Sequence, residues 1–210
     1  MQRAQLAIFM FVPIRKDVFR WETPYPLKSQ NLVGHIILRD SVCILVDPPH
    51  VPGLVEAVKR LCETTDIVLT SQNHLRGTAY IASMTGATVY VPEQDESAVE
   101  PGGLLALKTI GNYEKYVEGE VLGMKVFRDF YDFALLTPEG ELIVSDNARG
   151  TPEGTLSLWP ESMPDVPPNP PNENIHREFR QLVAESSATT LLSGHGCDII
   201  GNLQELAEGL

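Results

Sequence analysis

Hydrophobic runs alternate with polar turns along the first half of the chain, and they predict strands that alternate with helices. Short runs rich in Val, Ile and Leu predict strands at residues 31–38, 42–46, 67–70 and 87–91. Apolar side chains at helical spacing predict one helix over residues 51–61. A second helix is predicted to end near Met84, where Gly86 can cap it. This alternation indicates an α/β layered fold.

The second half of the chain has a different pattern, with strands that follow one another directly. Strands are predicted at residues 104–110, 124–127, 133–137, 142–144 and 189–192, with a hairpin turn at residues 138–140. Helices are predicted at residues 175–184, with Asn174 as the cap, and at residues 203–210. Two β-rich halves flanked by helices suit a sandwich of two sheets covered by helices, in one domain over residues 1–210.

Two segments depart from this pattern. Residues 6–14 are apolar, but a charged segment follows at once and no small-residue cleavage site is present. We therefore expect a first core strand there rather than a signal peptide. Residues 151–174 are rich in proline, with six prolines between Pro160 and Pro171, which excludes a helix or a central strand. This loop either covers a pocket as a lid or packs down as a simple connection.

Composition and charge narrow the classes of partner. The chain is 43% hydrophobic and 21% charged, and its net charge of −12 argues against nucleic acid or an anionic membrane surface as a partner. No apolar run approaches the roughly 20 residues of a membrane span. Three scattered cysteines, Cys43, Cys62 and Cys197, are expected to be reduced thiols in a cytoplasmic protein. A minor reactive role for Cys197, two residues after His195, stays open.

The stretch over residues 66–78 carries the candidate chemistry. A buried strand runs into a polar turn, which then opens a helix, and α/β proteins commonly place functional groups at such a point. This turn resembles the metal-binding turn Thr-His-x-His-x-Asp-His of the metallo-β-lactamase fold family. Three further features follow the family's order: Asp47 resembles its Asp-x-Gly element, Asp146 ends a strand similar to Leu-Phe-x-Gly-Asp, and His195 lies in a similar Gly-His element. The resemblance covers about residues 30–197 and implies a four-layer αββα sandwich.

The ligands of that family do not appear in the turn. Aligned from Thr70, the expected ligand positions fall on Ser71, Asn73, Leu75 and Arg76, and one more falls on Arg128. Among the family's ligand positions, only those of Asp146 and His195 hold side chains that can bind a metal. A hydrolytic zinc site needs about three protein ligands per metal and an open water position. A complete two-metal centre is therefore excluded.

Two residues of the turn offer different substitutes: His74 for a missing metal ligand, and Arg76 for the metal ion itself. His74 lies one residue off the ligand frame; either it is a partly buried histidine bonded to backbone, or a local shift makes it the third ligand of a single zinc, iron or manganese ion, with Asp146 and His195. Arg76 is expected to pair with Asp146 where a metal would lie, with Arg128 in support. The alternative places Arg76 in solvent in the first turn of the helix. Asp47 is expected to hold the turn through hydrogen bonds to backbone.

Three functions follow from these alternatives. The first is a metal-free member of the fold, without metallohydrolase activity, that keeps a small polar pocket for a small-molecule ligand. The residues of that pocket are Asp47, Ser71, Asn73, Arg76 and Arg128. The second is a hydrolase of an ester, thioester or lactone-like bond with one metal on Asp146, His195 and His74. The third is a protein–protein module that presents the Pro-rich loop. A homodimer through the N-terminal segment stays open, and neither Gly-x-Ser-x-Gly nor a phosphate-binding loop is present.

Overall fold

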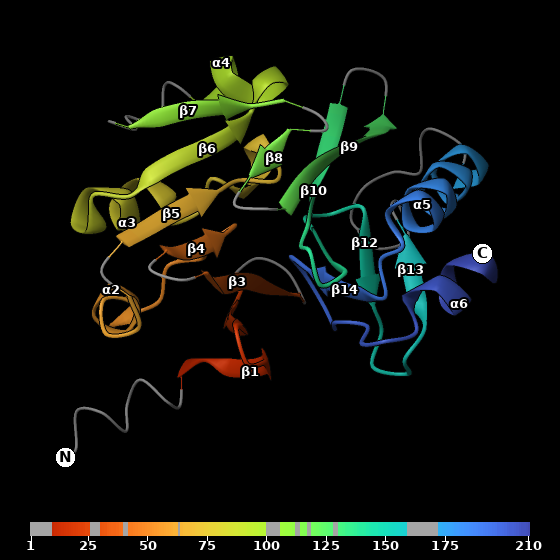
Figure 1. Ribbon diagram of the computed structural model, residues 1–210, viewed down its shortest axis with the longest axis horizontal. Helices are drawn as coiled ribbons and strands as arrows, with labels where there is room; N and C mark the ends of the chain where they lie inside the picture. The colour runs from red at the N-terminus through yellow and green to blue at the C-terminus, as the bar shows by residue number, and fades with distance from the viewer. Residues whose placement is uncertain are drawn as a thin grey trace. The chain divides into compact units, whose positions relative to one another are not determined.

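A computed structural model describes residues 10–25, 30–39, 42–62, 64–99, 106–111, 114–116, 119–127, 130–158 and 172–210. The chain divides into two compact units, Met1–Ile110 and Gly111–Leu210, here called the N-terminal unit and the C-terminal unit. Each unit combines a β-sheet with helices, which confirms the predicted α/β class (Figure 1). The assignment of both units to one domain stays a prediction.

The N-terminal unit contains a seven-stranded sheet whose strands lie in chain order. The strands are β1 (Val12–Arg15), β2 (Val18–Pro24), β3 (Asn31–Arg39), β4 (Val42–Val46), β5 (Thr64–Val68), β6 (Thr88–Pro92) and β7 (Leu107–Ile110). Neighbours from β1 to β4 are antiparallel, and neighbours from β4 to β7 are parallel. Because parallel strands end at the same edge of a sheet, the segments that follow β4, β5 and β6 lie close together.

The helices of this unit pack on the sheet through an apolar core. They are α2 (Leu54–Val58), α3 (Thr78–Thr85) and α4 (Glu96–Val99), with short 3-10 helices η1 (Gln72–His74) and η2 (Glu93–Asp95). The prediction of a helix over residues 51–61 was too long, since Gly53 has a left-handed φ of 83° and α2 begins only after it. Gly86 ends α3 as predicted, with a φ of 75° and its N–H bonded to the carbonyl of Ala82 at 2.8 Å.

Trp21 joins β2 to the segment that follows β4. Its indole ring is buried against Gly34, where an added Cβ would lie 2.6 Å from the ring, so a larger side chain does not fit there. The indole N–H donates to the carbonyl of Pro49 at 3.0 Å. Trp21 thus holds in place the segment that begins with Asp47. The hydrophobic pattern of the sequence did not predict β2, the strand that supplies this side chain.

The C-terminal unit contains a five-stranded sheet in the order β14-β11-β10-β9-β8. Its strands are β8 (Lys115–Tyr116), β9 (Gly119–Phe127), β10 (Phe130–Leu136), β11 (Glu141–Val144) and β14 (Thr190–Ser193). The pair β11 and β14 is parallel and the others are antiparallel, so the segments after β11 and β14 lie at the same edge. A separate hairpin pairs β12 (Ala148–Gly150) with β13 (Leu156–Leu158). The predicted turn at residues 138–140 joins β10 to β11.

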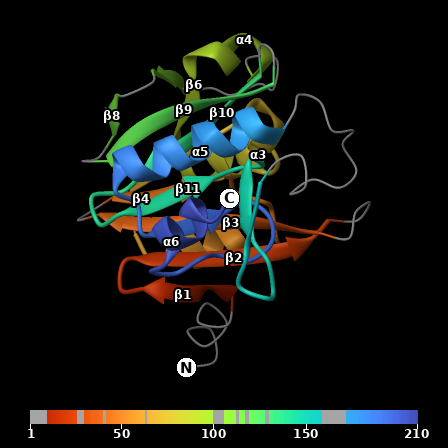
Figure 2. The same ribbon diagram turned by 90° about the vertical axis from the view of Figure 1, so that its right-hand side faces the viewer.

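Two helices cover this unit's apolar core, α5 (Asn172–Ser186) and α6 (Leu203–Glu208). Figure 2 shows α5 lying across the strands of the unit. The prediction of Asn174 as the cap was wrong, because α5 already includes Asn172. Residues 160–171, the core of the Pro-rich loop, fall outside the described residues. None of the described helices has the length and apolar character that a membrane span requires.

Candidate functional site

The polar turn between β5 and α3 lies where the sequence analysis expects it. After Val68 the chain passes through Leu69 and Thr70 into η1. Ser71 precedes η1, is fully buried, and accepts a hydrogen bond on its Oγ from the backbone N–H of Asn73 at 3.3 Å. Asn73 itself is exposed. The Ser71 side chain at the first ligand position therefore stabilises the turn, and Asn73 at the second is in contact with solvent.

A buried carboxylate from the neighbouring strand holds this turn. Asp47 directly follows β4, with a left-handed φ of 46°. Its Oδ1 accepts the backbone N–H of Thr70 at 2.8 Å. Its Oδ2 accepts the Thr70 hydroxyl at 2.5 Å and lies 2.9 Å from Nδ1 of His74. The hydrogen bond to the turn backbone that we expect of Asp47 is present.

The charge state of Asp47 follows from these neighbours. Burial raises the pKa of the Asp47 carboxyl, since a charged group loses hydration there. The His74 ring, the Arg76 guanidinium and the hydrogen bonds from His74 and Thr70 outweigh burial and hold this pKa below its ordinary value. Asp47 is therefore ionised at neutral pH, and its carboxylate acts only as an acceptor.

The guanidinium of Arg76 contacts the same cluster. Arg76 lies before α3 and has a left-handed φ of 38°. Its Nη1 donates to the carbonyl oxygens of Val33 at 2.7 Å and of Asp47 at 3.0 Å, and its Nη2 lies 3.1 Å from Nε2 of His74. The alternative of a solvated residue in the first helical turn is therefore wrong, because Arg76 is half-buried and donates to main-chain carbonyls.

Both ring nitrogens of His74 have partners within the N-terminal unit. Nδ1 faces the ionised carboxylate of Asp47, so Nδ1 carries the ring proton and donates it. Nε2 lies 3.1 Å from Nη2 of Arg76, which can only donate, so a hydrogen bond between the two uses the lone pair of Nε2. The expected bond from His74 to backbone is thus replaced by bonds between its ring and the Asp47 and Arg76 side chains.

A second buried carboxylate, which was not predicted from the sequence, holds the turn. Asp95 lies in η2, just after β6, and its Oδ2 accepts the backbone N–H of Gln72 at 2.7 Å. Burial raises the pKa of Asp95, although the hydrogen bond from Gln72 opposes the shift. Its position just past the end of a strand parallel to β5 is the signal that could have identified it.

In the C-terminal unit, Asp132 accepts hydrogen bonds from a turn, as Asp47 does in the N-terminal unit. Asp132 lies in β10, is fully buried, and accepts a hydrogen bond from the Ser145 hydroxyl. It also accepts the backbone N–H groups of Asp146 at 3.1 Å and of Asn147 at 3.2 Å. Asp132 was not predicted from the sequence either. A charged residue in the middle of the otherwise apolar strand 130–136 was the available signal.

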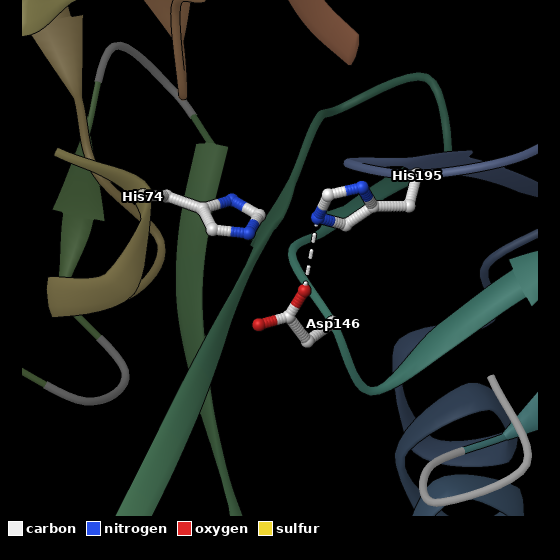
Figure 3. A group of neighbouring side chains, drawn as sticks. All are labelled: His74, Asp146 and His195. Atoms are coloured by element: carbon white, nitrogen blue, oxygen red, sulfur yellow. Dashed lines mark ion pairs between the residues drawn. The ribbon is translucent and has the colours of Figure 1, made fainter. Parts of the chain in front are cut away.

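Asp146 and His195 meet at the ends of two parallel strands. Asp146 follows β11 and His195 follows β14, and Oδ1 of Asp146 lies 3.1 Å from Nε2 of His195 (Figure 3). Their side chains are 15% and 7% exposed, respectively. The backbone between them is fixed, since the N–H of Gly194 bonds to the carbonyl of Val144 at 2.8 Å. The unit therefore presents a nearly buried carboxylate paired with an imidazole.

The remaining predicted site residues have mixed outcomes. Leu75 is half-buried and packs against the apolar core of the N-terminal unit. Arg128 falls outside the described residues. The ion pair between Arg76 and Asp146 joins residues of different units and stays a prediction. Three described side chains offer metal-ligating atoms for the candidate site: His74, Asp146 and His195.

Comparison with known proteins identifies the family. A family model described as "Metallo-beta-lactamase superfamily" matches residues 10–210. The chain belongs to this superfamily. No curated protein is significantly similar in sequence.

Several solved structures resemble the chain along nearly its full length. DIM-1 metallo-β-lactamase is 15% identical over 95% of this chain and 96% of that chain, with a TM-score of 0.70. A metallo-β-lactamase from Pontibacter korlensis is 13% identical over 94% of both chains, with a TM-score of 0.67. A flavo-di-iron protein from Thermotoga maritima is 12% identical over 94% of this chain and 60% of that chain, with a TM-score of 0.65. Identities this low show the fold alone, and they confirm the resemblance described above.

The two-metal centre that the superfamily resemblance implies does not fit the donors of the N-terminal turn. Leu75 has no ligand atom, and Arg76 is a donor only. A metal bonds a histidine nitrogen at about 2.0–2.1 Å, so an ion on Nε2 of His74 would compete for space with the guanidinium at 3.1 Å. Asp146 and His195 differ, because both can ligate. Their 3.1 Å separation is close to the roughly 3.0–3.4 Å between two ligands of one ion.

Proposed function

We propose that this chain is a metal-independent member of the superfamily, without metallohydrolase activity, in which the cation of Arg76 takes the electrostatic place of a bound metal. The turn then lines a small polar site for a small-molecule ligand. The observation that carries the proposal is the contact of Nη2 of Arg76 with Nε2 of His74. It occupies the lone pair that His74 would offer to a metal.

Electrostatics supports the same conclusion. A guanidinium keeps its charge at every ordinary pH. A divalent cation about 4 Å from this fixed charge, in a partly buried site, meets a repulsion of several kcal/mol. A metal on His74 would therefore have to displace Arg76 from the carbonyls of Val33 and Asp47 as well as from the ring.

The proposal includes the predicted pair between Arg76 and Asp146. Asp146 is a nearly buried carboxylate, and such a group needs a cation or several donors to remain ionised. One partner of Asp146 is His195, which carries charge only when protonated. A permanent cation from the other unit would neutralise Asp146 at any pH, with Arg128 in support.

Metal content tests the proposal directly. The full chain is produced without a His tag in medium supplemented with zinc, iron and manganese, and the metals are then measured by mass spectrometry. We expect a small fraction of one ion per chain. A content near one ion per chain would overturn the proposal.

Variants at position 76 test whether the Arg76 cation is what keeps a metal from binding to His74. Arg76→Ala removes the cation from His74, so zinc binding in a calorimetric titration should become detectable. Arg76→Lys loses the fork of hydrogen bonds but keeps a positive charge, and it should bind zinc more weakly than Arg76→Ala. Arg20→Ala, which removes an arginine paired with Glu22 on β2, is the matched control and should behave as the wild type. Equal zinc affinity in all four proteins would contradict a role for Arg76.

A hydrolase with one metal ion is the second candidate, and the spacing of Asp146 and His195 favours it. In that case His74 would complete a three-ligand site for zinc, iron or manganese. A panel of esters, thioesters and lactones, assayed with each metal, distinguishes the two functions. Activity that a chelator removes, and that both His74→Ala and His195→Ala abolish, would establish this second function instead.

The third function, a protein–protein module, rests on the Pro-rich loop and stays a prediction. Replacing residues 160–171 with a Gly/Ser linker tests it, because a partner recognised through this loop should then be lost. Sedimentation of the wild-type chain measures the predicted homodimer.

A further inference from the structure

Two of the three cysteines lie close together at the core of the N-terminal unit. Cys43 lies in β4 and is fully buried within the apolar core. Cys62 follows α2, is half-buried, and packs against that same core. Neither is part of a disulfide. Cys197, the third cysteine, belongs to the C-terminal unit.

Strand register explains why these two cysteines meet. β4 and β5 pair in parallel, and Cys43 lies opposite Thr65, three residues after Cys62. The backbone N–H of Cys62 bonds to the carbonyl of Val58 at 3.2 Å, which holds Cys62 at the end of the last turn after α2. The segment that leaves α2 therefore returns to the sheet beside Cys43. The Cys62 thiol lies close enough to the Cys43 thiol to raise its pKa.

We propose that Cys43 and Cys62 form a reversible disulfide when the protein meets a peroxide, a modification site that the proposed function does not require. The more exposed sulfur, that of Cys62, attacks the O–O bond of hydrogen peroxide as a thiolate, gives a sulfenic acid and releases hydroxide. The sulfur of Cys43 then attacks the sulfenic sulfur, loses its proton and releases water. In sum, two thiols and one peroxide give one disulfide and two waters.

The environment of Cys43 sets this order of events. Burial raises the pKa of the Cys43 thiol well above its ordinary value, and the neighbouring Cys62 raises it further. Cys43 thus stays protonated at neutral pH and is shielded from oxidant, which leaves Cys62 as the first site of attack. The finished bond would tie the segment after α2 to β4, the strand that leads into Asp47.

Peptide mapping tests the proposal on the full, reduced chain. The protein is treated with hydrogen peroxide, blocked with N-ethylmaleimide and digested with trypsin without reduction. We expect the peptide of residues 40–59, which holds Cys43, to be linked to the peptide of residues 61–76, which holds Cys62. The intact chain should keep its monomeric mass less two hydrogens, and Cys197 should carry the maleimide. Reduction with dithiothreitol should separate the two peptides.

Three variants sharpen the test. Cys197→Ser is the matched control and should form the linked peptide at the wild-type rate. Cys43→Ala should stop at the sulfenic acid of Cys62, which dimedone traps, and Cys62→Ala should leave the Cys43 thiol unoxidised at the same peroxide dose. Wild-type protein in which Cys62 is oxidised to sulfinic acid or links two chains, with no bond to Cys43, would overturn the proposal.

Discussion

The turn after β5 and the turn after β11 are built alike and carry opposite charge. In each, a buried aspartate accepts one hydroxyl and at least one backbone N–H of the turn: Asp47 in the N-terminal unit and Asp132 in the C-terminal unit. The first turn then presents the guanidinium of Arg76, and the second presents the carboxylate of Asp146.

The comparison shows that the hydrogen bonds that hold a turn, here called its frame, are separate from the side chains at its ligand positions. Asp47 holds its turn through groups that have no need of a metal, namely Thr70 and His74. The frame can therefore persist while the side chains at ligand positions change from acceptors to a donor. The difference also predicts where each turn is most sensitive, because Asp47 faces a cation, whereas Asp132 accepts hydrogen bonds from the Ser145 hydroxyl and from two backbone N–H groups.

The largest expected effect is that of removing each buried carboxylate. Asp47→Ala leaves Arg76 and His74 without their anion and should lower the free energy of unfolding by about 3–5 kcal/mol. Asp132→Ala leaves neutral donors unsatisfied and should cost about 2–3 kcal/mol. Urea denaturation measures both. Glu22→Ala, at an exposed ion pair, is the control and should change stability by less than about 0.5 kcal/mol. A larger loss for Asp132→Ala would break the comparison.

Acid should lower the free energy of unfolding by less than Asp47→Ala does, since protonated Asp47 keeps part of its hydrogen bonding. The folded pKa of Asp47 lies below its unfolded value of about 3.8. Its carboxylate therefore contributes stability that is present above that value and is lost as the pH falls through the folded pKa. The pKa of Asp95 is raised, so its contribution is present below the ordinary value and is lost as the pH rises. Urea midpoints between about pH 6 and pH 2 should be less acid-sensitive in Asp47→Asn than in the wild type.

A tight backbone approach in each unit gives the next prediction. A Cβ on Gly77 would lie 2.8 Å from the backbone nitrogen of His50, and a Cβ on Gly150 would lie 2.8 Å from the carbonyl oxygen of Cys197. Alanine at either position should cost about 2 kcal/mol in thermal or urea unfolding, because backbone must move. Gly86→Ala meets open space and should cost only about 1 kcal/mol, from its left-handed φ. Equal costs at all three positions would show that the close approaches do not matter.

The smallest effect has the opposite sign. Among the described residues, the buried hydroxyl of Thr78 has no hydrogen-bond partner. Thr78→Val removes this polar atom at nearly constant volume and should raise the free energy of unfolding by about 1 kcal/mol. Thr70→Val is its counterpart in the turn before α3 and should lower stability by about 2 kcal/mol, because that hydroxyl bonds to Asp47. Destabilisation by Thr78→Val would indicate a partner for this hydroxyl.

The elements that the sequence predicted well are those whose pattern is local. The strands β3 and β4 are rich in Val, Ile and Leu, and Gly86 marks the end of α3 through its own conformational freedom. The position of Asp47 beside the turn also followed from motif order. Strand β2 was missed because charged and apolar residues mix in it, and only its pairing with β1 and β3 identifies it.

The candidate site was harder to predict because its contacts depend on backbone angles. Arg76 reaches the carbonyl of Val33 from a backbone with a φ of 38°, and the local sequence does not predict this φ. Asp95 and Asp132 reach their turns from neighbouring strands, so their roles depend on sheet order rather than on spacing along the chain. Residue types identified the mismatch with a metal site, but the contacts that His74 makes instead depend on how the chain folds.

The buried position of Trp21 makes its fluorescence a reporter of the segment that follows β4. The chain has two tryptophans, and Trp159 falls outside the described residues, so Trp159→Phe leaves a single indole, sealed against Gly34 and bonded to Pro49. An indole shielded from water emits at short wavelength, and any opening of the Asp47–Pro49 segment would shift its emission to the red. Fluorescence can therefore follow ligand binding, thiol oxidation or the position 76 variants at this segment in real time.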